Sequence, residues 1–456
     1  MAFTKRGVGA VAVAVLVLAA CSSSKKAATT ATTAATGTTA AATGATTGST
    51  TASTAANGGL AFPNVVVPPI SGSTTTGVSA TEIRVGAIYY KLFYGDGLSG
   101  FQARIKKEND AGGVFGRKIS VVAALDDGQD NSTDLTAAKT LVQQDNVFAV
   151  APVFTAAFSA ASYLNDNKVP FFGWSVQPSW CGLNWGFGFW GNDCDETKLP
   201  VTGNFVLAEQ SLFPDKTAKG KAIAVVAEDN DSARVEADDV TAIWNSNGSK
   251  VVETDATIPS PPAVVGDYTP YAEKIMTSNA GKPPDLVEII GSVSDTLQLY
   301  KKLQQLNYAG VVQDFDLYDP HFAANTKGLV TNIQLEPFEA ASQVPAVQTM
   351  ITDLKAYDPN ISLSQPSAAG YWTADFLIQA LKKAGQNLTR EALYNAINSG
   401  FTYDYNGGGG VPVQWPLGHQ YIQVGTGYVQ ANGTGFTLLL RPDHLLPLVK
   451  NPGYKP

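Results

Sequence analysis

Groups that could bind an anion gather where one apolar run meets a helical segment. Residues 147–153 form an apolar run, and Phe154-Thr155-Ala156-Ala157 lead from it into helical spacing. A hydroxyl beside the unpaired N–H groups of a helix start favours an anionic ligand group. Thr155 and Ala156 are therefore candidate ligand contacts, with Thr155 as a hydrogen-bond donor. An ordinary helix N-cap or turn is the alternative.

The first of three cysteines stands at the end of a segment typical of secretion. Lys5 and Arg6 precede an uncharged, mostly apolar run over residues 7–18, which is too short to span a bilayer. Leu18-Ala19-Ala20-Cys21 resembles the lipobox of bacterial lipoproteins. The resemblance implies a signal peptide over residues 1–20, cleavage before Cys21 and lipidation of its thiol, which gives a durable membrane anchor. An ordinary signal peptide with a chance cysteine is the alternative.

Cys181 and Cys194 are then left as a pair outside the cytoplasm. A disulfide is their expected state there, and two free thiols are the alternative. The loop between them is rich in Trp and Gly, and Trp174, Trp180, Trp185 and Trp190 suggest either an aromatic flap or plain packing. Its residues 186–191 formally fit G-x-G-x-x-G, but bulky aromatics and the lack of a strand-to-helix context argue against a dinucleotide site.

Composition excludes several other classes of function. Lys and Arg number 31 and Asp and Glu 39, so the net charge of −8 disfavours nucleic acid as a partner. The three histidines, His321, His419 and His444, are scattered, and no multi-His or Cys-ligated metal site is expected. The sequence has no Gly-x-Ser-x-Gly, Walker A or His-Glu-x-x-His motif. We therefore expect neither an enzyme nor a cofactor, although an acidic-pair hydrolase escapes such a search.

Two stretches of alternating strands and helices must position these groups. The chain has 456 residues, of which 44% are hydrophobic, which suits two or three domains. Such alternation predicts parallel sheets with helices on both faces, hence two doubly wound α/β lobes with a cleft between them. The expected strands are 83–88, 118–125, 147–153 and 169–173, then 222–227, 250–255, 286–290 and 311–313. The expected helices are 100–111, 133–144 with Ser132 as N-cap, 158–165, 233–245, 268–278, 295–306 and 368–383, and short strands follow residue 411.

The segment before these stretches has a different composition. Residues 27–58 contain only Ala, Thr, Gly, Ser and one Asn, which cannot bury a core. A Pro-containing stretch follows at residues 63–69. We predict a flexible tether over residues 21–77 and a folded body from Val78.

Short motifs in a fixed order connect the folded body to a known family. They are Val85-Gly86-Ala87, Tyr94-Gly95, Asn109-Asp110-Ala111-Gly112-Gly113, Gly116-Arg117-Lys118-Ile119, Asp126-Asp127 with Asp130, Val169-Pro170, Gly370-Tyr371 and Leu381-Lys382-Lys383-Ala384-Gly385. In this order, behind a lipobox, the chain resembles the Leu/Ile/Val-binding protein family, the type I periplasmic solute-binding proteins of ABC transporters.

The resemblance implies a hinged pair of lobes. In this family the chain crosses between the lobes three times, which here falls near Leu199, Pro337 and Gly418. Lobe one would comprise residues 78–200 plus 338–417, and lobe two residues 201–337 plus 418–456. The lobes close around a ligand that contacts both of them, and the closed form docks on a membrane permease.

The resemblance also implies further ligand contacts. The family holds a ligand carboxylate at the position of Thr155 and at the turn after the next strand. That turn is Ser175-Val176-Gln177 here, with Ser175 as a donor. In lobe two, a carboxylate after the next strand could accept hydrogen bonds from a ligand ammonium group. The further candidates are Gly291 and Ser292 at a strand end, Asp314 and Asp316 after the next strand, and Tyr94 and Tyr371 as aromatic walls; ordinary packing or solvated loop positions are the alternatives.

Departures from the family pattern broaden the expected ligand. Gln177 stands where the family has Thr, and residues 231–234 replace a Tyr-Gly. Phe315 stands in the simplest alignment with the family's acidic contact, so the register of that contact is open. Branched-chain amino acids are therefore not implied.

The expected function is capture of a small polar solute, namely an amino acid, an amide or a small organic acid. The expected partners are this solute and an ABC transporter permease, with a lipid anchor and no nucleic acid. The protein would sit at the cell surface or in the periplasm. A ligand-sensing receptor module or an extracellular hydrolase is the alternative.

Overall fold

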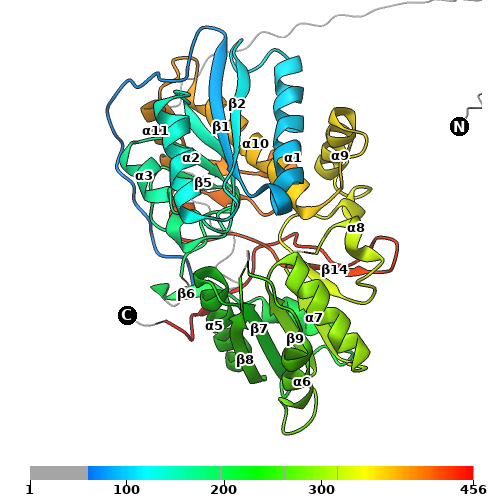
Figure 1. Ribbon diagram of the computed structural model, residues 1–456. Helices are drawn as coiled ribbons and strands as arrows, with labels where there is room; N and C mark the ends of the chain where they lie inside the picture. Colours follow the sequence, from blue (N-terminus) through cyan, green and yellow to red (C-terminus); the bar gives the residue numbers. More distant parts are fainter. Residues whose placement is uncertain (1–59, 196–197, 261–262, 316, 455–456) are drawn as a thin grey trace, which may run out of the picture. The chain divides into compact units, whose positions relative to one another are not determined.

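Two β-sheets organise the part of the chain that the computed structural model describes, which is residues 60–454 without 196–197, 261–262 and 316. The predicted signal peptide, the lipidation site Cys21, most of the predicted tether and Asp316 lie outside the described residues. We call each sheet with the helices packed on it a lobe (Figure 1). The two lobes confirm the predicted α/β fold class.

Lobe one is built on a parallel five-stranded sheet of order β2-β1-β3-β4-β5. Apolar residues on its two faces belong to separate core clusters, so helices cover both faces. The strands are β1 Glu82–Tyr89, β2 Lys118–Asp126, β3 Ala149–Phe154, β4 Phe171–Gly173 and β5 Gly186–Gly188. Helices α1 Lys91–Asp110 and α10 Gln365–Ala384 pack on one face, and α2 Asn131–Gln143 and α3 Ala161–Asp166 on the other.

The close crossing of α1 and α10 depends on glycine. A Cβ added at Gly370 would lie 1.9 Å from the backbone oxygen of Gly97, and one at Gly100 would lie 2.1 Å from that of Ser367. Only residues without a side chain allow this approach of two helix backbones. The contact fixes the N-terminal ends of both helices at the same end of lobe one.

Lobe two is built on a seven-stranded sheet of order β15-β14-β11-β10-β9-β7-β8. Strands β7 to β11 run parallel, whereas β14 and β15 are antiparallel, so the predicted short strands of the tail extend this sheet. The strands are β7 Ala222–Glu228, β8 Lys250–Ile258, β9 Leu286–Ile290, β10 Val311–Asp314, β11 Val330–Ile333, β14 Gly427–Ala431 and β15 Phe436–Leu440. Helices α4 Val206–Glu209 and α5 Asp231–Ser246 cover one face, and α6 Thr269–Thr277 and α7 Val293–Gln305 the other.

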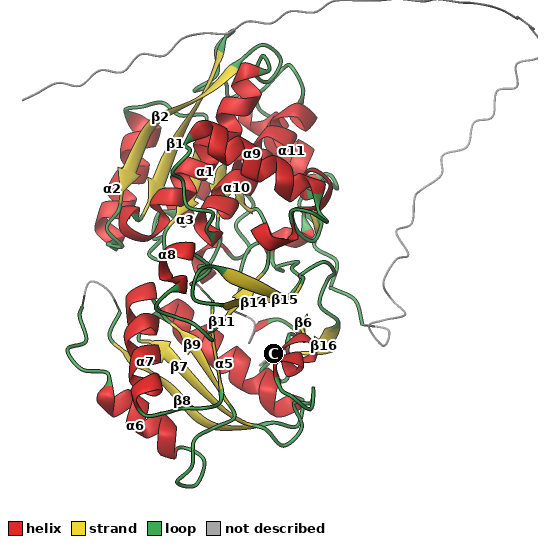
Figure 2. Cartoon of the chain, turned by 90° about the vertical axis from the view of Figure 1, so that its right-hand side faces the viewer, coloured by secondary structure: helices red, strands yellow, loops and turns green. Residues whose placement is uncertain are grey.

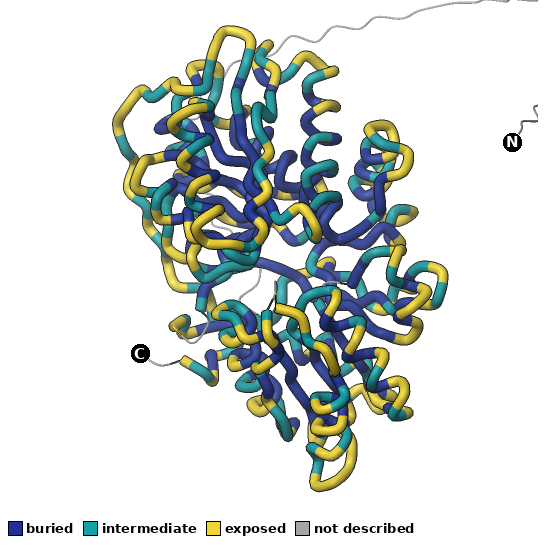
Figure 3. Tube along the Cα trace, viewed as in Figure 1, coloured by how far each residue is buried: buried dark blue, intermediate teal, exposed yellow. Residues whose placement is uncertain are grey.

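Smaller elements lie around the two sheets (Figure 2). Figure 3 shows the central strands of both sheets as buried and the outer helix faces as exposed. The remaining helices are α8 Pro320–Ala323, α9 Pro345–Tyr357, α11 Arg390–Asn398 and α12 Tyr405–Gly408. Two-stranded sheets are formed by β12 Thr402–Tyr403 with β13 Val413–Gln414, and by β6 Val201–Gly203 with β16 Leu448–Lys450.

The predicted element types are confirmed, and some boundaries differ. Helix α1 begins at Lys91 rather than near residue 100, because it continues through a non-helical turn at Tyr94 (φ −103°, ψ 18°) that interrupts the apolar spacing. The N-cap of α2 is Asp130, whose side chain accepts a 2.8 Å hydrogen bond from the N–H of Thr133. The predicted N-cap Ser132 instead donates its hydroxyl to Asp130.

Residues 60–77 fell in the predicted tether but are held against lobe one. The Asn395 side chain bonds both the N–H and the carbonyl of Ile70, at 2.9 and 2.8 Å. The carboxylate of Glu391 accepts from the N–H and the hydroxyl of Thr74. At the other end, Phe62 contacts the ring of Tyr421 at 4.9 Å between centroids. The described body therefore begins before Val78, along the blue segment of Figure 1.

No helix among residues 60–454, apart from the gaps given above, is long and apolar enough to cross a membrane.

Candidate functional site

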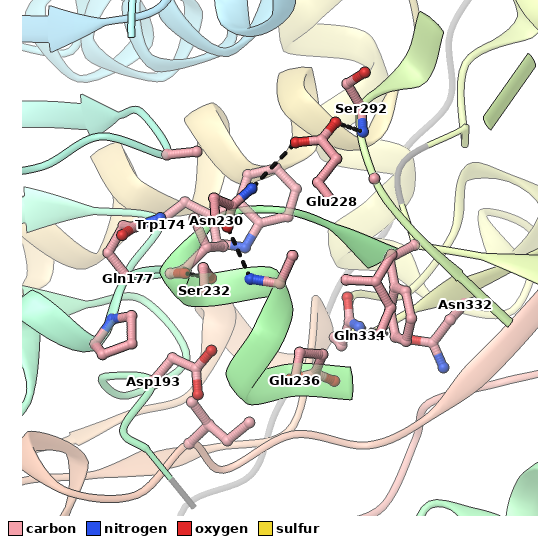
Figure 4. A pocket seen from close by; sticks show the side chains of 18 of the residues that line it. Trp174, Gln177, Asp193, Glu228, Asn230, Ser232, Glu236, Ser292, Asn332 and Gln334 are labelled. Atoms are coloured by element: carbon pink, nitrogen blue, oxygen red, sulfur yellow. Dashed lines mark hydrogen bonds between the residues drawn. The ribbon is translucent and has the colours of Figure 1, made fainter. Parts of the chain in front are cut away.

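A cavity of about 1510 Å³ is lined by residues of both lobes (Figure 4). Most of its polar residues follow the carboxyl ends of parallel strands, where ligands bind in open α/β sheets. Trp174 follows β4, Asn230 follows β7 and Gly291 follows β9. The volume exceeds the 300–1,000 Å³ usual for small-molecule sites. It leaves room for the lobes to approach each other on a bound solute.

The lobe-one wall of the cavity is aromatic. Trp174 is 4% exposed, and its ring meets Tyr94 and Trp190 edge-on at 5.9 and 5.7 Å. Ser175 accepts the indole N–H of Trp190 at 3.1 Å. The indole N–H of Trp174 has no hydrogen-bond partner among the described residues. The wall thus offers an apolar face, behind which the indole N–H of Trp174 is buried without a hydrogen bond to the described residues.

The lobe-two wall centres on Glu228, the last residue of β7. Its two carboxylate oxygens accept the N–H of Ser292 at 2.6 Å and the side-chain amide of Asn230 at 3.1 Å. Asn230 also N-caps α5 by accepting the N–H of Ala233 at 2.8 Å. Burial, and then the hydrogen bond to Asp295, raise the pKa of Glu228 to about 7. This carboxyl therefore changes charge near neutral pH.

Hydrogen bonds join the two lobes beside the cavity, and one of them runs from the side chain of Gln365 to that of Gln334 at 3.4 Å. Ser232, in the first turn of α5, donates its hydroxyl to the backbone oxygen of Val176 at 2.8 Å. Val176 belongs to the turn after β4, so the bond connects lobe two to lobe one beside the cavity. A single bond of this kind contributes only about 1 kcal/mol, so it can break and re-form as the lobes move.

The predicted disulfide is confirmed, and it borders the cavity. Cys181 and Cys194 are bonded, with their Cα atoms 5.0 Å apart. The loop that they close holds strand β5 and Trp190, and Cys194 itself lines the cavity. The glycine-rich residues 186–191 form β5 and a turn, and the described residues 192–195 directly after them are not helical. The disulfide closes the loop that carries Trp190 of the aromatic wall.

Six of the predicted contact residues line the cavity, from both lobes. Their roles toward a ligand stay predictions. They are Tyr94, Ala156, Val176, Gln177, Gly291 and Ser292. Phe315 lines it too, so an aromatic ring stands where the family alignment expected a carboxylate.

The other described candidates do not line the cavity, because their polar atoms are used inside the protein. Thr155 accepts the N–H of Ala157 at 3.1 Å, and Ser175 donates to the carbonyl of Gly191 at 2.6 Å. Asp314 accepts from Thr331 and from the N–H of Leu317, each at 2.8 Å, and Tyr371 donates to Asp353 at 2.5 Å. Asp316 lies outside the described residues.

Sequence reasoning missed several lining residues. Glu228 and Asn230 follow the first strand of lobe two, so the strand-end rule could have found them. Glu236 lies four residues after Ser232, on the same face of α5. No sequence pattern indicated that Phe62 lines the cavity, because it stands in the segment predicted as a tether.

His419 has no place in the site. It is 1% exposed, and its Nε2 lies 2.6 Å from the amide oxygen of Asn398. Burial lowers its pKa to about 3, so it stays neutral and structural. Among the described residues, no group of three or more His, Cys, Asp or Glu could hold a metal ion.

Solved structures with the same fold include several transporter components. A fatty acid ABC transporter substrate-binding protein from Thermomonospora curvata is 18% identical, with a TM-score of 0.67 over 81% of this chain and 94% of its own. The branched-chain amino acid transporter substrate-binding protein LivJ from Streptococcus pneumoniae, in complex with isoleucine, is 16% identical, with a TM-score of 0.62 over 79% and 100%. A solute-binding protein from Rhodopseudomonas palustris BisB5, in complex with 3,4-dihydroxybenzoic acid, is 16% identical, with a TM-score of 0.63 over 80% and 98%.

None of the curated protein sequences matches the chain. The sequence profile described as periplasmic binding protein, by contrast, matches residues 89–429. This span runs from the last residue of β1 into β14, and so covers most strands of both sheets and both walls of the cavity. The chain therefore belongs to the periplasmic binding protein family.

Proposed function

We propose that the protein captures a small polar solute outside the cytoplasm and delivers it to an ABC importer. The observation that carries this proposal is the cavity lined by two lobes, with an aromatic wall on one side and a hydrogen-bonding wall on the other. A solute that contacts both walls favours the closed arrangement, because only differential binding can shift the equilibrium between open and closed lobes.

The path of the chain between the lobes supports hinge closure. After β11 of lobe two, helices α9 and α10 pack on lobe one, and β14 then returns to lobe two. With the earlier connection from β5 to β7, this makes three crossings, which we place near the predicted Leu199, Pro337 and Gly418. Hinges of this kind absorb a change in backbone torsion at a few loop residues while each lobe moves as a body.

The chemistry of the two walls narrows the class of solute that the cavity can bind. The rings of Tyr94, Trp174 and Trp190 suit an apolar or planar body. The indole N–H of Trp174 can donate, and Glu228 can accept from a ligand ammonium or amide group. An amino acid or amide fits both walls, whereas a small organic acid must avoid the acidic side.

A lipid anchor on Cys21 belongs to the same proposal. Its support is the lipobox-like Leu18-Ala19-Ala20-Cys21 after an apolar run. Mass spectrometry of the N-terminal peptide from membranes would show diacylglyceryl and acyl additions on Cys21. A Cys21→Ser variant that stays as tightly membrane-bound as the parent would contradict the anchor.

Thermal unfolding against a solute panel tests the capture of a solute. The purified protein is first unfolded and refolded to remove any copurified ligand, and then screened with amino acids, amides, amines, organic acids and sugars. A ligand at 100 times its dissociation constant stabilises the native state by about 2.7 kcal/mol, which raises the melting temperature by a few degrees. A Glu228→Gln variant should lose most of the shift for a solute with an ammonium group.

Small-angle X-ray scattering then tests closure. The radius of gyration should decrease when the stabilising solute is added. No stabilisation by any member of the panel, or stabilisation without compaction, would contradict solute capture by hinge closure.

A further inference from the structure

A second group of carboxylates lies deeper in the same cavity, within lobe two. Glu209 ends α4, Glu236 projects from α5 and Glu288 lies within β9; all three line the cavity. We call them the glutamate recess. Glu209 and Glu288 are each 1% exposed. Glu236 is marked in Figure 4, on the α5 segment that also carries Ser232. None of the three was a candidate in the sequence.

Nothing in the described residues neutralises the glutamate recess. Glu288 accepts the indole N–H of Trp244 at 2.9 Å, and the hydroxyl of Tyr428 lies beside Glu209. Glu209 Oε1, however, is buried without a hydrogen-bond partner, and no described ion pair reaches any of the three glutamates. Glu209 lines the cavity, so this unsatisfied buried oxygen is an acceptor that a ligand can pair.

Acidic side chains predominate in the whole lining of the cavity. Its described cationic side chains are Lys91 and Arg234. Arg234 is exposed and paired with Asp229 and Asp231. Acidic lining residues outnumber them, namely Asp96, Asp193, Glu209, Glu228, Asp231, Glu236, Asp239, Glu288 and Asp319. A low-dielectric cleft lined by one sign of charge concentrates solutes of the opposite sign.

The electrostatics of the recess show what a ligand would change. Burial raises the pKa of Glu209 well above its ordinary value, that of Glu236 to about 7, and that of Glu288 to about 8. Repulsion from Glu288 adds to the rise at Glu209, and repulsion from Glu236 adds to the rise at Glu288. Asp239 and Asn332 also face the cavity here, and neither supplies a positive charge. A bound cation would favour the ionised carboxylates and release their protons.

We propose that the glutamate recess binds a cationic group of the captured solute, an ammonium or a guanidinium, so that the transported class is organic cations. The described carboxylates do not converge as metal ligands do, which favours a spread-out group with several N–H donors over a metal ion. This inference rests on the proposed capture of a solute in the cavity. It goes further by naming the charge of that solute and the residues that select it.

Matched pairs of probes test the selection of charge. The purified, refolded protein is titrated calorimetrically with arginine against citrulline, lysine against norleucine, and 1,4-diaminobutane against 1-aminobutane. Each pair keeps the size of the solute and changes one positive charge. In at least one pair, we expect the member with the additional positive charge to bind at least tenfold more tightly than the other member at pH 7.5. Titration in buffers of different ionisation enthalpy should show that protons are released on binding.

Two variants connect that preference to the recess. Glu236→Gln should reduce the ratio of affinities within the pair, and should release fewer protons. Asp238→Asn, an exposed change on the same helix, is the control and should leave both quantities unchanged. Circular dichroism of both variants checks that they fold.

The possible failures are distinguishable. Equal affinities within every pair, or an unchanged ratio in Glu236→Gln, would overturn the inference. If a neutral or acidic solute from the wider panel binds while no cation does, solute capture stands and the cationic class is wrong. If no solute of any class binds, the proposed function fails and the inference fails with it.

Discussion

The two walls of the cavity face the same space but are built from different chemistry. The lobe-one wall consists of Tyr94, Trp174 and Trp190, held by ring contacts and a disulfide. The lobe-two wall consists of carboxyl and amide groups around Glu228 and the glutamate recess. Aromatic contacts are insensitive to pH and select shape, whereas buried carboxyls respond to pH and select charge. We therefore expect the first wall to supply much of the affinity and the second to set the class of solute.

Of the changes considered, removal of the disulfide beside the lobe-one wall should have the largest effect on stability. Cys181→Ser with Cys194→Ser should lower the free energy of unfolding by about 3 kcal/mol, because the closed loop no longer restricts the unfolded chain. Urea denaturation measures this loss. The variant should not respond to a reducing agent, whereas the parent should. An unchanged urea midpoint would show that packing alone holds the wall.

Truncating Trp174 should weaken ligand binding more than any single change in lobe two. Trp174→Ala should cost about 2 kcal/mol of binding free energy, as truncation of a buried aromatic contact residue does. Calorimetry with the solute identified by thermal shift measures it. Trp174→Phe keeps a ring and loses only the N–H donor, so it should retain most of the affinity. Equal losses in the two variants would mean that the indole N–H, rather than the aromatic face, carries the contact.

The acidic wall should make stability depend on pH. The folded-state pKa values of Glu228 and Glu236 are raised to about 7 and that of Glu288 to about 8. A carboxyl group whose pKa is higher in the folded state contributes stability that is fully present below its pKa in the unfolded chain, which is about 4.5. That contribution is lost as the pH rises through 7 to 8. The melting temperature of the ligand-free protein should therefore fall between pH 5.5 and 8.5.

Glu236→Gln with Glu288→Gln should flatten this fall in part. Asp134 in lobe one also has a pKa raised to about 7, chiefly by burial, so some slope should remain. A slope unchanged by the two substitutions would place the pH response outside the glutamate recess.

Thr155→Ala should have the smallest effect on binding. The hydroxyl accepts the N–H of Ala157 and does not line the cavity, so its loss should cost about 1 kcal/mol of stability. Solute affinity should stay within twofold of the parent value. A tenfold loss of affinity would instead support the sequence-based prediction that Thr155, directly after β3, contacts an anionic group of the ligand.

The fold could be predicted from sequence periodicity, because each strand and each helix has its own local pattern of apolar residues. Strand β9 was predicted with its observed bounds, Leu286–Ile290, because an apolar run between polar turns marks a buried strand. Helix α1 was predicted too short, since the turn at Tyr94 interrupts the apolar spacing.

The residues of the site could be predicted less completely than the fold, because successive side chains at a strand end point in opposite directions. Ser175 points into the protein while Val176 and Gln177 line the cavity, and Thr155 and Ala156 divide in the same way. Sequence places the turn but not which of its neighbours faces the ligand. The glutamate recess was beyond sequence reasoning, because it joins three elements from distant parts of the chain.

The attachment of residues 60–77 changes where the functional unit of this protein starts. The family profile begins at residue 89, and composition alone would place the start of the body at Val78. A protein that began at residue 89 would lose most of β1, and one that began at Val78 would keep both sheets but lose Phe62, which lines the cavity and contacts Tyr421. Such a protein would fold and yet present an altered binding surface, so its ligand profile would describe the truncation rather than the protein. Proteins expressed for ligand discovery should begin upstream of Leu60.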